Sequence, residues 1–103
     1  MLPAEITDNA ALHRFELHVE GETAILLYEK KEPLLRLIHT EVPQPLEGKG
    51  VGSKLVGAVL QFARENKLNV VPLCPFVAQY IKRHPEYASI VDEPYRWMIA
   101  PGG

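Results

Sequence analysis

In the first half of the chain, polar and apolar side chains alternate, and this pattern predicts strands. Residues 14–19 carry apolar side chains at every second position, as expected for a strand with one buried face. Residues 23–29 are apolar on both faces, which favours a more central strand, and Glu20-Gly21 before them predicts a tight hairpin turn. A third run, residues 34–42, ends where prolines begin. We therefore expect an antiparallel meander of three strands.

The second half of the chain changes to a helical period. Apolar side chains recur at helical spacing from Val51 to about Asn66, which predicts a helix with one broad apolar face. Residues 69–73 are short and β-branched, so the order strand, helix, strand predicts a crossover whose two strands run parallel. A second, short helix is expected to begin near Pro75 and to end before Pro85.

The two ends of the chain lack a clear period. Residues 1–10 are expected to be a polar lead-in, with ordered structure beginning near Leu12. Beyond Glu86 the pattern favours turns. The large apolar residues of this last segment are expected to cover an edge or an interface: Tyr95, Trp97, Met98 and Ile99.

Between the predicted strand at residues 34–42 and the long helix lie three glycines at alternate positions, Gly48, Gly50 and Gly52. Glycines at the start of a helix let the backbone approach a ligand, and the free N–H groups there favour an anion such as phosphate. A nucleoside-triphosphate P-loop is excluded because Lys49 is followed by glycine rather than by Ser or Thr. A dinucleotide fingerprint is excluded because residues 69–72 lack the required acidic side chain. The remaining well-known use is the diphosphate loop of acetyl-CoA-dependent acyltransferases.

Composition and charge narrow the class of protein. A chain of 103 residues, 47% hydrophobic and 23% charged, has the balance of one globular domain. The net charge of −2 and the scattered Lys and Arg residues disfavour nucleic acid as a partner, and no apolar stretch approaches membrane-spanning length. The single cysteine, Cys74, agrees with a reducing compartment, so the cytoplasm is expected. His13, His18 and His84 lack the spacing of a metal cluster, so no metal site is expected.

The segment Glu47 to Leu55, preceded by a strand that ends at residues 39–42, resembles motif A of the GCN5-related N-acetyltransferases. Residues 39–43, 71–77 and 84–87 are similar to the small single-domain branch described as YjdJ-like or N-acetyltransferase domain-containing. The resemblance covers about Asn9 to Val91.

This resemblance implies a fold. It is a minimal acyl-CoA N-acyltransferase α/β domain with a mostly antiparallel sheet, one parallel βαβ crossover and helices packed on the sheet. The whole chain would be one such domain, with its core at about residues 9–91. Larger relatives have two further helices after the first strand and further strands at the end, which are missing here. The coenzyme site is therefore expected to be shallow and open.

The resemblance also implies site residues. The strand end at Thr40, Glu41 and Val42 would hold the thioester carbonyl. Cys74 stands near the position of an Asn that touches the coenzyme, and Tyr80 lies about one residue from a Tyr that protonates the departing thiolate. The diphosphate would be bound by the backbone of the glycine loop, which consists of Gly48, Lys49, Gly50, Val51, Gly52 and Ser53.

Two details of the loop bear on its charge. Family members usually carry Arg or Gln where Glu47 stands, and a carboxylate is an unusual neighbour for a diphosphate. Lys49 and Lys54 can offset the charge of the anion.

The chemistry leaves alternatives. Cys74, at a helix start, could be a reactive thiol that takes the acetyl group, or a small buried apolar residue. Glu41 or His39 could act as the base on the amine, or could simply face solvent.

Two functions remain open. The first is transfer of acetyl from acetyl-CoA to a primary amine by direct attack, with an unknown acceptor that is a small molecule or a protein. The alternative is a CoA-binding or protein-interaction module with little or no activity. The protein is expected to be a monomer or a weak homodimer.

Overall fold

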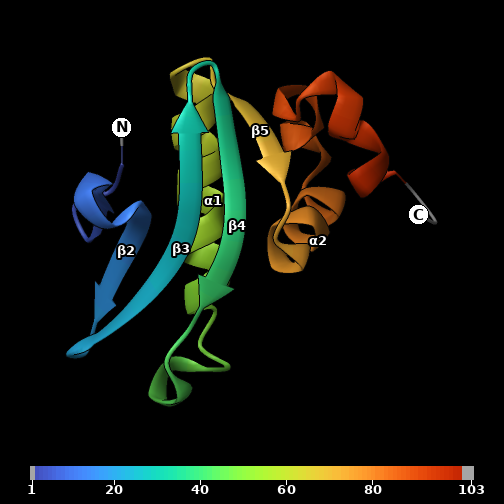
Figure 1. Ribbon diagram of the computed structural model, residues 1–103. Helices are drawn as coiled ribbons and strands as arrows, with labels where there is room; N and C mark the ends of the chain where they lie inside the picture. The colour runs from blue at the N-terminus through green and yellow to red at the C-terminus, as the bar shows by residue number, and fades with distance from the viewer. Residues whose placement is uncertain (1, 101–103) are drawn as a thin grey trace.

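The computed structural model describes residues 2–100, which form a five-stranded sheet with two α-helices (Figure 1). The strands are β1 (Ile6–Asn9), β2 (Arg14–Val19), β3 (Glu22–Lys31), β4 (Leu34–Glu41) and β5 (Asn69–Pro72), and the helices are α1 (Val51–Glu65) and α2 (Pro75–Arg83). Short 3₁₀ helices occupy Ala10–Leu12, Gln44–Leu46, Pro85–Ile90 and Glu93–Ile99.

The strands follow one another in chain order across the sheet, from β1 at one edge to β5 at the other. The first three pairings are antiparallel, and β4 pairs with β5 in parallel through the α1 crossover. The expected meander, crossover and fold class are therefore confirmed. The hairpin turn also forms where expected, with Glu20 and Gly21 both at positive φ, 52° and 79°. This conformation matches the right-handed twist of the paired strands.

The core lies between the sheet and α1. In Figure 1, α1 lies behind β3 and β4, and no helix within residues 2–100 covers the front of these strands. Every fully buried leucine or valine in this layer stabilises the fold by about 1.5–3 kcal/mol relative to an exposed position. The buried residues of α1 lie on one face, as its apolar period predicts: Val51, Gly52, Leu55, Val56, Val59, Leu60 and Ala63.

The expectation of an unstructured lead-in is wrong, because residues 6–9 form the edge strand β1. Ile6 is 5% exposed and joins the core, and Asp8 accepts a 2.6 Å hydrogen bond from the hydroxyl of Tyr28. This short strand contains a single large apolar side chain. It is held by backbone pairing to β2 and by the Asp8–Tyr28 bond, neither of which leaves a periodic signal in the sequence.

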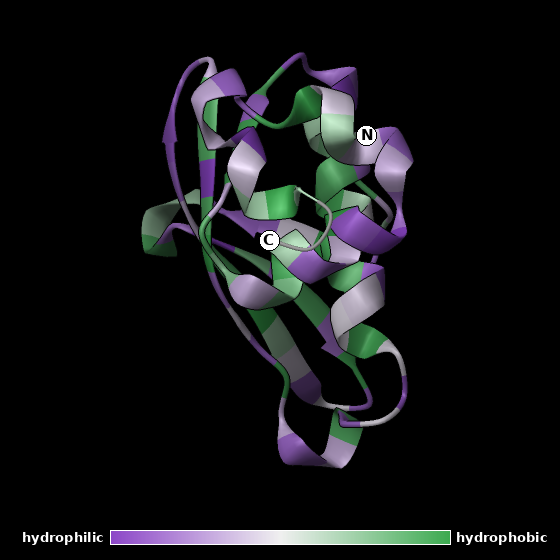
Figure 2. Cartoon of the chain, turned by 90° about the vertical axis from the view of Figure 1, so that its right-hand side faces the viewer, coloured by the Kyte–Doolittle hydropathy of each residue, from purple (hydrophilic) through white to green (hydrophobic). Residues whose placement is uncertain are grey.

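The C-terminal segment covers the outer edge of β5. Val91 forms a bridge with Val70, and the N–H of Asp92 donates a 2.8 Å hydrogen bond to the carbonyl of Val70. Figure 2, which views the molecule from this side, shows the segment in front of β5 and α2. Tyr95 and Ile99 pack against the core, whereas Trp97 is 67% exposed. The expectation that the apolar residues of this segment cover a sheet edge therefore holds for Tyr95 and Ile99 but not for Trp97.

β4 carries an irregularity where it separates from its neighbours. Leu27 and Tyr28 of β3 lie opposite His39 and Leu37, so Ile38 is an extra residue on β4 and forms a bulge. The parallel pairing with β5 stops at the same place, with Leu37 opposite Pro72. The last residues of β4 consequently have no β5 neighbour.

Candidate functional site

The glycine loop links the end of β4 to α1 and holds a backbone conformation that favours glycine. Gly48 and Gly50 have φ values of 81° and 74°, and a Cβ added at either would meet no atom within 4 Å. Space therefore does not require glycine here; the left-handed backbone does, because it costs other residues roughly 1–2 kcal/mol. Leu46, 1% exposed, anchors the loop to the core from the preceding 3₁₀ turn.

The start of α1 has the features that favour an anion. Gly50 is its N-cap, no side chain caps the helix, and its first turn contains no acidic residue. The N–H groups of a first helical turn have no partner within the helix, and the helix dipole adds positive potential there. The 15-residue α1 therefore offers backbone donors to an anion, with no carboxylate of its first turn competing for them.

A hollow of about 280 Å³ lies over this loop. Gly52 forms part of its wall because a Cβ there would lie 3.0 Å from the ring of Phe76 and 3.3 Å from Val42. Phe76 projects from α2 and is 43% exposed, so its ring is a wall of the hollow rather than a core residue. Glycine at position 52 thus permits close contact between the two helices. The remaining lining residues are Leu46, Glu47, Gly48, Gly50, Val51 and Ser53.

Both lysines of the loop region are already paired with carboxylates. Lys49 Nζ lies 3.3 Å from Glu20 in the hairpin turn, and Lys54 Nζ lies 2.8 Å from Glu5. The four side chains are 40–65% exposed, so these ion pairs are weak and exchangeable. An incoming anion would have to compete for these lysines, whereas the N–H groups of the first turn of α1 have no partner within the helix. Glu47 is exposed at the rim of the hollow.

Cys74 closes the gap that opens between β4 and β5. Its N–H donates a 2.9 Å hydrogen bond to the carbonyl of Leu37, the last β4 residue paired with β5. Its thiol lies 3.3 Å from the hydroxyl of Thr40, and the residue is 3% exposed. Cys74 is also the N-cap of α2. The structure therefore brings together Thr40 and Cys74, two of the residues singled out in the sequence, at the point where the strands separate.

His39 and Glu41 lie on the other face of β4. Their side chains are 56% and 62% exposed, and His39 Nε2 lies 4.0 Å from Glu41 Oε2. Because side chains alternate along a strand, this pair points away from the buried side to which Thr40 turns. The two residues expected as alternative bases are thus neighbours, and both are accessible to solvent.

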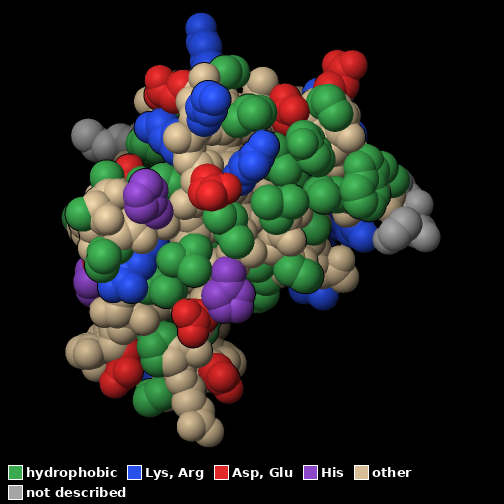
Figure 3. Space-filling view, viewed as in Figure 1, with side chains coloured by type: hydrophobic (Ala, Val, Ile, Leu, Met, Phe, Trp, Pro, Cys, Tyr) green, Lys and Arg blue, Asp and Glu red, His purple; other side chains and the backbone are tan. Residues whose placement is uncertain are grey.

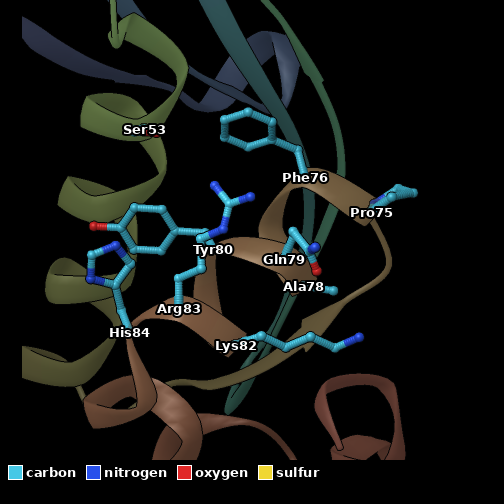
Figure 4. Close-up of a pocket in the computed structure, with 9 residues that line it drawn as sticks. All are labelled: Ser53, Pro75, Phe76, Ala78, Gln79, Tyr80, Lys82, Arg83 and His84. Carbon is cyan, nitrogen blue, oxygen red and sulfur yellow. The ribbon is translucent and has the colours of Figure 1, made fainter. Parts of the chain in front are cut away.

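Tyr80 occupies a second hollow, of about 620 Å³, between α1 and α2 (Figure 4). Its hydroxyl lies against α1, where a Cβ added at Gly57 would be 2.5 Å away. Its ring stacks on His84 at a centroid distance of 4.1 Å. Burial, with smaller contributions from Tyr87 and Glu86, raises the pKa of the Tyr80 hydroxyl, so it stays protonated at neutral pH. Within residues 2–100, no hydrogen bond, ion pair or ring contact joins the Tyr80 side chain to Thr40, Cys74 or Glu41.

The two hollows form one groove along the junction of the helices, because Ser53 and Phe76 line both. Figure 4 shows Phe76 and Tyr80 extending from successive turns of α2 toward α1. In the sequence, Phe76, Val77, Tyr80 and Ile81 recur at helical spacing and form the apolar face of this helix. The structure divides that face, since Val77 and Ile81 are buried in the core and the two aromatic residues line the groove.

Several polar residues of the larger hollow were not anticipated: Gln79, Lys82, Arg83 and His84. Gln79 and Arg83 could have been found from their place on α2, since they follow Phe76 by three and seven residues and therefore share a helix face with it.

Within residues 2–100, no group of three His, Cys, Asp or Glu side chains is arranged to hold a metal ion. None of the helices in this range is long and apolar enough to cross a membrane.

Comparison with known proteins agrees with the geometry. A family model described as GCN5-related N-acetyl-transferase matches residues 14–90, from β2 through the 3₁₀ turn after α2. Protein NATD1 of Gallus gallus is 30% identical over 86 residues, which cover 81% of this chain and 78% of that protein. Protein NATD1 of Homo sapiens is 30% identical over 86 residues, 81% of this chain and 76% of that protein. Protein NATD1 of Xenopus tropicalis is 32% identical over 75 residues, 70% and 69% of the two chains. The family match covers most of the chain, and the fold has the glycine loop at an uncapped helix start and the separation of β4 from β5. The protein therefore belongs to the GCN5-related N-acetyltransferase family.

Proposed function

We propose that the protein binds acetyl-CoA in the groove between α1 and α2 and transfers the acetyl group to a primary amine. The observation that carries this proposal is the continuity of the groove. It begins at the uncapped start of α1, where left-handed glycines expose backbone N–H groups, and it continues past Phe76 along α2. An elongated ligand with a diphosphate in its middle matches such a surface.

The residues of the chain fit this ligand in separate parts. The backbone of Gly48 to Ser53 binds the diphosphate, through the same donors that any anion would use there. Lys82 and Arg83, on the exposed side of α2, supply positive charge to a further phosphate in the larger hollow. The thioester lies at Thr40, Glu41 and Val42, where β4 has lost its β5 neighbour. No sheet hydrogen bonds from β5 compete for the backbone in this segment.

In the transfer, the nitrogen lone pair attacks the thioester carbonyl, a C–N bond forms, the C–S bond breaks, and coenzyme A leaves as a thiolate. The proton on the nitrogen of the tetrahedral intermediate passes to Glu41 or His39, which are exposed on the acceptor side, or to water. Tyr80 is protonated at neutral pH, and it is the acid candidate of the groove. Cys74 lines the thioester position, and its burial favours a packing role over nucleophilic attack.

The second candidate function is a coenzyme-binding module without efficient catalysis. It is favoured by one observation. The two side chains expected to act as the base, His39 and Glu41, lie 4.0 Å apart and are open to water rather than in an enclosed acceptor pocket. Under either function we place the protein in the cytoplasm, where Cys74 stays a free thiol.

The test combines binding with turnover. Coenzyme A and acetyl-CoA are titrated by calorimetry, and release of free coenzyme A is then followed with a panel of small amines, polyamines and lysine peptides. Binding together with amine-dependent release supports the acetyltransferase. Binding without release by any amine supports the module, and failure of both ligands to bind or to raise the melting temperature rejects both functions.

A further inference from the structure

The face of the sheet that α1 does not cover carries an ordered set of side chains (Figure 3). In the strand register, Glu16 of β2 lies opposite Ile25 of β3, which lies opposite Glu41 of β4. Figure 3 views this side and shows apolar side chains between charged side chains and histidines. The apolar central strand is therefore flanked by charged groups on both neighbouring strands.

A hollow of about 280 Å³ lies on this face, lined by Arg14, Thr23, Ile25, Glu41, Val42 and Pro43. Val42 also lines the hollow over the glycine loop. Val42, directly after β4, is thus a wall shared by the hollow on the uncovered face and the hollow over the glycine loop. A molecule on the uncovered face is therefore next to the strand end at which we place the thioester.

Arg14 at one end of this hollow uses only part of its hydrogen-bonding capacity. Its Nε donates a 2.7 Å hydrogen bond to Glu16, and its side chain is 32% exposed. No other ion pair or hydrogen bond of the Arg14 side chain occurs within residues 2–100, and the two terminal amino groups remain available. A guanidinium has five donors in a fork that matches a carboxylate.

Glu16 holds the guanidinium in place. Its carboxylate also accepts a 3.0 Å hydrogen bond from Asn9 and lies 3.4 Å from the ring of His18. These partners anchor one edge of Arg14, so that its free edge is oriented without a ligand present. An oriented donor group binds a carboxylate at a lower entropic cost than a freely moving one.

We propose that this hollow binds the acetyl acceptor and that the acceptor is an ω-amino acid, a molecule with a carboxylate and a primary amine at the two ends of an aliphatic chain. The carboxylate binds the free edge of Arg14, the chain lies on Ile25, and the amine lies at Glu41. Strands two apart in a sheet are separated by roughly 10 Å. An α-amino acid is too short to bridge them, and a simple amine leaves Arg14 without a ligand. This inference rests on the proposed function, because it names the acceptor.

The test uses a matched pair of ligands. ε-Aminocaproate and pentylamine have the same amine and the same chain, and only the first has a carboxylate. Each is titrated into the protein without coenzyme, and the methyl resonances of Ile25 and Val42 are followed by NMR. We expect ε-aminocaproate to shift these resonances and to bind about tenfold more tightly than pentylamine, the ratio that one charge-assisted contact supplies.

Variants assign the two ends. Arg14→Lys keeps a positive charge beside Glu16 but loses the fork, so it should weaken ε-aminocaproate about tenfold and leave pentylamine unchanged. Glu41→Gln should weaken both ligands. Arg36→Lys is the matched control: Arg36 lies on the same face, 4.0 Å from Glu29 and outside the hollow, and this variant should bind both ligands as the wild type does.

Equal affinity for the two ligands, unshifted Ile25 resonances, or equal effects of Arg14→Lys and Arg36→Lys would overturn the inference. Circular dichroism checks that each variant is folded, and Glu41→Gln tests the site independently if Arg14→Lys is not. The proposed function is judged separately by coenzyme A binding. If coenzyme A binds and ε-aminocaproate is no better than pentylamine in binding and in turnover, only the acceptor assignment fails.

Discussion

The contact between Gly57 on α1 and Tyr80 on α2 sets the width of the groove, and it can be tested by a double-mutant cycle. A Cβ at position 57 would lie 2.5 Å from the Tyr80 hydroxyl oxygen and 3.2 Å from the ring carbon that carries it. Gly57→Ala therefore cannot be accommodated unless Tyr80 moves. Tyr80→Phe removes the atom with the severe overlap and leaves the ring in place.

The magnitude follows from two opposing effects. Replacing glycine by alanine within a helix stabilises it by about 1 kcal/mol. Displacing Tyr80 from His84 costs about 0.5–1.5 kcal/mol of aromatic packing. We therefore expect Gly57→Ala to leave the stability of the wild type nearly unchanged. In the Tyr80→Phe background it should stabilise by close to ~1 kcal/mol, which for a domain of this size raises the melting temperature by about 4–8 °C.

The assay is chemical denaturation of the wild type, both single variants and the double variant, with coenzyme A affinity measured for each. The expected coupling is about 1 kcal/mol, well above the error for residues that do not touch. If Gly57→Ala stabilises both backgrounds equally, the Tyr80 hydroxyl does not lie against Gly57 of α1. A weaker affinity for coenzyme A in Gly57→Ala alone would connect the position of Tyr80 to binding.

Three further predictions concern the loop, the thiol and the uncovered face. Gly50→Ala and Gly21→Ala both place a Cβ on a left-handed backbone in open space, so each should destabilise the protein by roughly 1 kcal/mol. Only Gly50→Ala should weaken coenzyme A binding, measured by calorimetry. Equal affinities of the two variants would contradict the assignment of the loop. Cys74→Ala should lower the melting temperature by a few degrees because a buried side chain is lost, while acetyl transfer persists; complete loss of transfer in a folded variant would instead support a nucleophilic thiol. Hydrogen bonds from Arg14 and Asn9 lower the pKa of Glu16, so its carboxylate stabilises the fold above its ordinary value near 4.5 and loses this effect as the pH falls through the lowered pKa. Unfolding measured from pH 6 to pH 3 should therefore show a shallower loss of stability in Glu16→Gln than in the wild type, and identical slopes would refute the coupling.

Most of the fold could be predicted from the sequence because its elements are long and periodic. The strands at residues 14–19 and 34–41 and the helix from Val51 bury one face each, and burial of one face is what produces a period. β1 has no such period, because Ile6 is its only core residue and the strand depends on backbone pairing. Sequence patterns detect buried surface, and an edge strand buries little of it.

The site was predictable only in part, for a related reason. The left-handed glycines have a direct sequence signature, because few other residues adopt that conformation. The contact of Thr40 with Cys74 joins residues 34 positions apart and depends on where β4 and β5 separate, which is a property of the folded sheet. The groove likewise depends on which side of α2 faces the core. Apolar spacing alone does not distinguish Phe76 in the groove from Val77 in the core.

The bulge at Ile38 determines which side chains reach which half of the site. Before the bulge, odd-numbered residues of β4 such as Leu35 and Leu37 point into the core, and after it the even-numbered Thr40 turns inward. One inserted residue therefore reverses the parity of the strand. If Ile38 were instead paired in a regular strand, His39 and Glu41 would turn into the protein, beside Cys74, and Thr40 would be exposed on the outer face. The accessible His39–Glu41 pair and the buried thiol are thus kept on opposite faces because Ile38 bulges out of the ladder.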